Sequence, residues 1–158
     1  MTGAAARTDW RPVRVIGVPD SLILFDGVCV LCSFWVRFVI DRDRAAQFHF
    51  APVQSPIGAE LAARLGIDPE NPETNAVILD GRAYFKSDAA LAVLSHLPRW
   101  PWVRLLHIVP RPLRDWCYDC VAGSRYRLFG RTDRCMMPTP DITARFLSEN
   151  PTASPRSL

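Results

Sequence analysis

Two cysteines three residues apart, Cys29 and Cys32, are the residues whose types and spacing best support chemistry in this chain. They follow the turn Asp26-Gly27 and begin an apolar run that we expect to be helical. Unpaired N–H groups at a helix N-terminus favour a thiolate, and a spacing of three brings both sulfurs to one helical face. The pattern therefore predicts thiol–disulfide exchange.

The two cysteines are expected to have different roles. Cys29 is the predicted attacking thiolate because it lies in the first turn, where we expect it to be the more exposed sulfur. Cys32, one turn deeper, is the predicted resolving thiol that attacks the mixed disulfide and releases the product. Asp26 is the third candidate catalytic residue: it could accept a proton when Cys32 attacks, cap the helix, or serve only as a turn residue.

The elements that must position these residues alternate between strands and helices. A buried strand at 22–25 precedes the turn, and the helix from Cys29 to about Asp41 is apolar on nearly all sides, which predicts a helix enclosed within the fold. The pattern then predicts a strand at 47–51, a helix at 56–65, a hairpin of strands at 75–79 and 82–85, and a helix capped by Ser87 that runs to about Leu97. This order is that of an α/β fold with a thioredoxin-like β-α-β-α-β-β-α core.

A helical extension is expected after this core. Prolines divide it into a short helix at 102–109, expected to pack on the core, and a longer helix from Leu113 to about Phe129. A second CxxC pair, Cys117 and Cys120, falls in an apolar repeat of helical period, which predicts a buried stripe in which cysteine is a small packing residue. Redox and metal-binding roles for this second pair remain alternatives.

The chain also resembles a known family in three blocks. Asp26, Gly27, Cys29 and Cys32 after an apolar strand, then 81–91 (GRAYFKSDAAL) and 124–138 (SRYRLFGRTDRCMMP), are similar to the DCC family of thiol–disulfide oxidoreductases. That family is a thioredoxin-like group with a DxxCxxC motif, so the resemblance implies the same fold and activity. Thioredoxin-like proteins usually place a proline just before the third core strand, and residues 74–76 carry none.

Composition bounds the function without naming the substrate. The chain has 158 residues, 49% of them hydrophobic and 22% charged, with a net charge of +3, as in an ordinary globular protein. We expect one domain over 21–140, including the extension from about 98, between an N-terminal tail at 1–20 and a C-terminal tail at 141–158. No secretory signal and no apolar run of about 18 residues occurs, which favours a cytoplasmic protein without a membrane span.

The expected partner is a disulfide-containing protein or small molecule, with an electron donor that the sequence does not name. No cofactor, resident metal or nucleic acid is expected, although arginines mixed with aromatic residues at 125–134 could contact RNA. Cys135 is either a third thiol near the pair or a buried loop cysteine. Two alternatives to the enzyme remain: a structural zinc module built from Cys29, Cys32, Cys117 and Cys120, and a non-catalytic binding domain.

Overall fold

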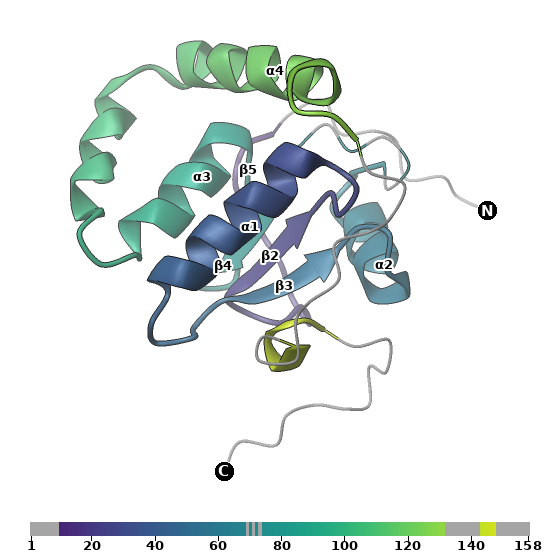
Figure 1. The fold of residues 1–158 in the computed structure, drawn as a ribbon. Coiled ribbons are helices and arrows are strands. Elements are labelled where there is room, and N and C mark those ends of the chain that lie inside the picture. The colour runs from purple at the N-terminus through teal and green to yellow at the C-terminus, as the bar shows by residue number, and fades with distance from the viewer. Residues whose placement is uncertain (1–9, 69, 71, 73, 132–142, 148–158) are drawn as a thin grey trace.

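A five-stranded mixed β-sheet lies at the centre of the fold, with helices on both faces (Figure 1). The computed structural model describes residues 10–68, 70, 72, 74–131 and 143–147. In sheet order the strands are β1 (Val13–Arg14), β5 (Arg82–Phe85), β4 (Ala76–Leu79), β2 (Leu22–Phe25) and β3 (His49–Pro52). Strands β2 and β3 are parallel, whereas β4 is antiparallel to β2 and β5 is antiparallel to β4. With the helices between them, these strands form a thioredoxin-like core, as the sequence predicted.

The two faces of the sheet are covered by different helices. One face packs against α1 (Val30–Arg42) and α3 (Lys86–Ser95), and the other packs against α2 (Pro56–Arg64) and residues near the N-terminus. Side chains of β2 alternate accordingly, because Ile23 and Phe25 belong to the first face and Leu22 and Leu24 to the second. Because β2 is buried on both faces, all of its residues are apolar. Asp26, the first candidate catalytic residue, directly follows its last residue.

The C-terminal extension consists of the 3₁₀ helix η1 (Pro101–Ile108) and the helix α4 (Arg111–Leu128), and a further short turn, η2 (Thr143–Arg145), follows. Helix α4 crosses above α3 and the N-terminal end of α1 (Figure 1). It therefore lies over the point where the CxxC motif begins. None of the helices in the described residues is long and apolar enough to cross a membrane.

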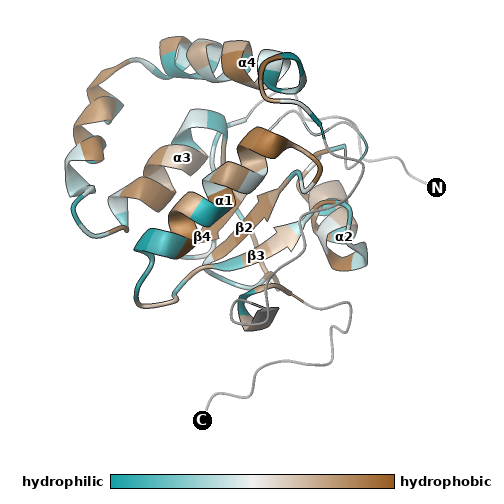
Figure 2. Cartoon of the chain, viewed as in Figure 1, coloured by the Kyte–Doolittle hydropathy of each residue, from teal (hydrophilic) through white to brown (hydrophobic). Residues whose placement is uncertain are grey.

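Two expectations about the helices were wrong, and a third held in part. Helix α1 is apolar along most of its length and hydrophilic at its C-terminal end (Figure 2), yet it is not enclosed, because Phe34 is 67% exposed. The short helix was expected to pack on the core, and η1 does contact α3 and buries Val103. Its other large apolar side chains are exposed: Trp102, Leu105, Leu106 and Ile108. Ser87 does not cap α3; Phe85 is the N-cap, and the Ser87 hydroxyl donates to Asp115 of α4.

Candidate active site

The turn that carries the cysteines is fixed by the neighbouring parallel strand. Strands β2 and β3 end at the same edge of the sheet, where Phe25 lies beside Pro52. The residues that follow them therefore meet: Gln54 Nε2 donates to Asp26 Oδ1 at 2.7 Å, and Gly27 N donates to Gln54 Oε1 at 2.9 Å. These bonds, together with Val28 N to Asp26 Oδ1 at 3.2 Å, set the path of the chain into α1.

Cys29 is the N-cap residue of α1. Its backbone is extended, and its Sγ accepts a hydrogen bond from the backbone N–H of Cys32 at 3.3 Å. This is the contact that a serine or aspartate side chain makes at other helix N-termini. The interpretation of Asp26 as the cap of this helix was therefore wrong, and the positive end of the helix acts directly on the Cys29 sulfur.

The two thiols differ in acidity. Hydrogen bonding from the Cys32 side chain, followed by its backbone N–H and the charge of Arg125, lowers the pKa of Cys29 from 9.0 to about 7, against the opposing effects of burial and Asp26. The same hydrogen bond to Cys29, together with burial, raises the pKa of Cys32 far above its ordinary value. Near neutral pH Cys29 is therefore the sulfur that ionises, whereas Cys32 keeps its proton.

The order of exposure is the reverse of the expected one. Cys29 is 0% exposed, whereas Cys32 is 7% exposed. The chain that leaves α4 folds back over Cys29: Arg131 forms a β-bridge with Cys29, and Val30 N donates to Gly130 O at 3.4 Å. The prediction that Cys29 is the more exposed sulfur was wrong because the sequence did not reveal this return of the chain.

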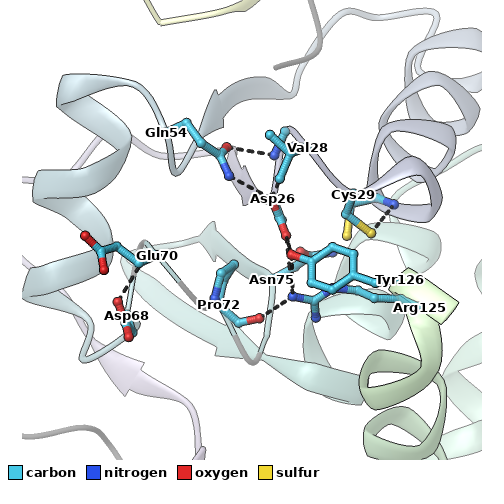
Figure 3. A network of polar contacts seen from close by, with 12 residues as sticks. Asp26, Val28, Cys29, Gln54, Asp68, Glu70, Pro72, Asn75, Arg125 and Tyr126 are labelled. Atoms are coloured by element: carbon cyan, nitrogen blue, oxygen red, sulfur yellow. Dashed lines mark hydrogen bonds and ion pairs between the residues drawn. The ribbon is translucent and has the colours of Figure 1, made fainter. Parts of the chain in front are cut away.

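Helix α4 also brings Arg125 and Tyr126 to the site (Figure 3). Arg125 Nη2 donates to Asp26 Oδ2 at 3.4 Å, to Tyr126 Oη at 3.3 Å and to Pro72 O at 2.6 Å. The Tyr126 hydroxyl in turn donates to Asp26 Oδ2, and burial and this carboxylate raise the pKa of Tyr126. A buried ion pair thus joins the CxxC turn to residues almost one hundred positions later in the chain.

The carboxylate of Asp26 has little free capacity to accept a proton. Asp26 is 1% exposed, and its two carboxylate oxygens already accept hydrogen bonds from four donors: Val28 N, Gln54 Nε2, Tyr126 Oη and Arg125 Nη2. An ionised carboxylate offers about four acceptor positions in all. Within the described residues it makes no hydrogen bond with either sulfur, so its contacts favour a positioning and electrostatic role.

The second CxxC pair is not buried. Cys117 and Cys120 are both exposed free thiols. The side of α4 that faces the core carries Tyr118, Ala122 and Arg125, so the apolar repeat did not mark the buried side of the helix. Among the described residues no group of three or more His, Cys, Asp and Glu side chains could hold a metal ion, so the two pairs do not form the zinc site considered above.

Three functional residues were missed by the sequence analysis or were given another meaning. Arg125 and Tyr126 were weighed only as a basic and aromatic mixture, although their place in the third family block pointed to the site. Gln54 could have been found from the rule that neighbouring parallel strands end at one edge of a sheet.

Two further features of the sequence analysis concern Cys135 and the proline position. Cys135 lies outside the described residues. No cis peptide bond occurs among the described residues, and none of residues 74–76 is a proline.

Comparisons with known proteins identify the family of this chain. The model of the DCC1-like thiol-disulfide oxidoreductase family matches residues 23–131, a range that holds both the cysteines and Arg125. An uncharacterised protein of Bacillus subtilis, YuxK, is 41% identical over 132 residues, covering 82% of this chain and 96% of its own length. A DCC family protein of Arabidopsis thaliana, named as chloroplastic, is 38% identical over 116 residues, covering 72% of this chain and 67% of its own. No solved structure gives a significant match.

Proposed function

The chain belongs to the DCC1-like thiol-disulfide oxidoreductase family, and we propose that it exchanges its Cys29–Cys32 dithiol with the disulfides of protein or small-molecule substrates. The observation that carries the proposal is the position of Cys29 as N-cap, where its sulfur accepts the Cys32 N–H and its pKa falls to about 7. A thiol with a pKa near ambient pH is close to the optimum for attack, since a large fraction is thiolate without great loss of nucleophilicity.

The proposed reaction has two steps. The Cys29 thiolate attacks one sulfur of the substrate disulfide, the substrate S–S bond breaks, and the first substrate thiolate leaves. Cys32 then loses its proton and attacks Cys29 Sγ, which breaks the mixed disulfide and releases the second thiolate. Two electrons pass from the protein to the substrate, and the Cys29–Cys32 disulfide remains.

The first step needs access to Cys29, which residues 130–131 cover. Among the described residues, the cover is held by the β-bridge between Arg131 and Cys29 and by a hydrogen bond from Val30 N to Gly130 O, which is long at 3.4 Å. We propose that residues 130–131 move aside when substrate binds. Asp26, in this scheme, holds Arg125 near the sulfurs through their ion pair, and Arg125 in turn stabilises the Cys29 thiolate.

Single cysteine variants test the proposal. Cys29→Ser is expected to abolish disulfide exchange, and Cys32→Ser is expected to accumulate mixed disulfides with substrate that mass spectrometry detects. Cys120→Ser is the matched control, because it replaces an exposed cysteine outside the site and should exchange at the rate of the unmodified protein. If mixed disulfides accumulate in Cys29→Ser instead, the roles are reversed; if no variant changes the exchange, the pair is not the redox centre.

The compartment and the extent of the functional unit are proposals as well. We propose a reducing, cytoplasmic location, where a CxxC pair is more often catalytic than structural. The functional unit was expected over 21–140; we propose that it extends beyond this range on both sides, because β1 (Val13–Arg14) joins the sheet and Arg145 pairs with the buried Asp43. Cell fractionation and the exchange activity of the 21–140 fragment would test these two points.

A further inference from the structure

A cavity of about 200 Å³ lies between α4 and the core, next to the cysteine pair. Its apolar walls come from α1, β4, α3 and α4: Leu31, Trp35, Val77, Ala89, Tyr118 and Val121. A cavity of about 150 Å³ in another protein holds a benzene molecule. The space here therefore suits one aromatic ring, or an aliphatic group of similar size.

The cavity has one polar side, formed by Lys86 and Arg125. Both residues also line an adjoining hollow that includes Asp119, whose carboxylate is 2.7 Å from Lys86 Nζ. Arg125 is 7% exposed, and its Nε has no acceptor among the described residues, although Nη2 has three. A buried donor without an acceptor destabilises the protein, so a ligand that brought an acceptor to Nε would bind more tightly.

Only one of the two cysteines borders this cavity. Cys32 is among the residues that line it, whereas Cys29 is not and is covered by residues 130–131 on its other side. In the oxidised pair, a thiolate that enters through the cavity meets the sulfur of Cys32 first. Attack there makes Cys29 the leaving group, and the N-cap hydrogen bond and the charge of Arg125 stabilise the departing thiolate.

We propose that the cavity binds a small thiol with an apolar, ring-sized body and a carboxylate, and that this thiol reduces the oxidised pair by attack on Cys32 Sγ. The inference rests on the proposed function and names the class of its electron donor. The thiolate forms a mixed disulfide with Cys32 and expels the Cys29 thiolate. A second donor thiolate then attacks the donor's sulfur, so that one donor disulfide is released, Cys32 takes up a proton, and two electrons have entered the protein.

The test compares two thiols with the oxidised full-length protein. The probe is 4-mercaptobenzoate, which has the ring and the carboxylate, and the reference is 2-mercaptoethanol, which has neither. We expect the reduction rate to saturate with 4-mercaptobenzoate and to rise linearly with 2-mercaptoethanol. Ala122→Leu, which adds volume to the cavity wall, should slow 4-mercaptobenzoate at least tenfold and change 2-mercaptoethanol by less than twofold.

Ala63→Leu is the matched control, because Ala63 lies on the exposed side of α2 and lines none of this cavity. If Ala122→Leu leaves the ratio of the two rates unchanged, the cavity does not bind the donor and the inference fails. A second measurement uses the unmodified protein: acid quenching followed by peptide mass mapping should find mercaptobenzoate on Cys32, and finding it on Cys29 would overturn the inference.

Dithiothreitol separates this inference from the function on which it rests. If dithiothreitol does not reduce the oxidised pair, or if the pair cannot be oxidised, the proposed function itself fails. If dithiothreitol reduces the pair but 4-mercaptobenzoate shows neither saturation nor sensitivity to Ala122→Leu, only the donor site is wrong.

Discussion

Replacement of Asp26 by asparagine separates an electrostatic role of this residue from a role in proton transfer. The change keeps the shape of the side chain and an oxygen for Val28 N and Gln54 Nε2, but it removes the charge opposite Arg125. Breaking a buried ion pair costs about 3–5 kcal/mol. Because asparagine keeps part of the hydrogen bonding, we expect the free energy of unfolding to fall by about 3 kcal/mol.

The same variant should lower the pKa of Cys29 further. The negative charge of Asp26 raises this pKa and Arg125 lowers it. Arg125 keeps its hydrogen bond to Pro72 O at 2.6 Å, so loss of the carboxylate removes one of the effects that raise the pKa and retains the effect of Arg125. The hydrogen bonds from Cys32 act more strongly than either charge, so we expect a fall of roughly half a unit to one unit below the present value of about 7. The pH dependence of thiolate absorbance in the ultraviolet would measure it.

The rate of mixed-disulfide resolution then distinguishes the two roles. If Asp26 only sets the electrostatics, the change should alter the rate of resolution by no more than about threefold, because Cys32 attacks Cys29 Sγ and the substrate thiolate is the leaving group. If Asp26 accepts the proton of Cys32, resolution should slow by about 100-fold or more, the usual effect of losing a general base. We expect the first result, because four donors already occupy the carboxylate.

Asp43→Asn is the matched control for this experiment. Asp43 is 3% exposed, caps the C-terminal end of α1 and pairs with Arg145, so its replacement also breaks a buried Asp–Arg pair. It should lower the free energy of unfolding by a similar amount and leave the pKa of Cys29 at about 7. A Cys29 pKa that stays unchanged or rises in Asp26→Asn would refute the electrostatic argument.

Three further predictions concern acidity, the second thiol pair and packing. Alkylation of Cys29 should rise with pH and reach half of its plateau near pH 7, because the thiolate reacts and its pKa is lowered to about 7; a midpoint near 9 would contradict the N-cap contact. Replacing Cys117 and Cys120 together by alanine should change the free energy of unfolding by less than about 0.5 kcal/mol in chemical denaturation, because both are exposed; a loss of about 2 kcal/mol would show that they pack. Gly58→Ala should lower the melting temperature strongly, since its Cβ would lie 1.8 Å from a backbone oxygen of β3. Gly123→Ala, whose Cβ would have nothing within 4 Å, should be neutral or stabilising by about 0.5–1 kcal/mol. Equal effects of the two changes on the melting temperature would refute the packing argument.

The order of the core elements could be predicted because each has a strong local pattern. The buried run of β2, the Asp80-Gly81 turn between β4 and β5, and the Ser55-Pro56 start of α2 depend on neighbours within a few residues. The family resemblance, now confirmed, set these elements in one known order. Local pattern was therefore sufficient for the sheet and for the place of the CxxC motif.

Burial was harder to predict, because it depends on which parts of the chain return to cover an element. The apolar repeat of α4 predicted a buried Cys117, yet the side chains that turn inward include Tyr118 and Arg125, whose polar ends find partners in the site. A charged residue can be buried when it has an ion-pair or hydrogen-bond partner, but a hydropathy pattern predicts that the same residue is exposed. The inward side of α4 was consequently mistaken for the outward side.

The same contacts give the site properties that the CxxC motif alone does not provide. The motif supplies two sulfurs at a helix N-terminus, which lowers the pKa of Cys29 in any such protein. Here Arg125, held by Asp26 and Pro72, adds a buried positive charge and at the same time forms one wall of the cavity beside Cys32. One arginine from α4 thus links the acidity of the Cys29 sulfur to the cavity that Cys32 lines, so a ligand that contacts Arg125 would also act on the Cys29 thiolate.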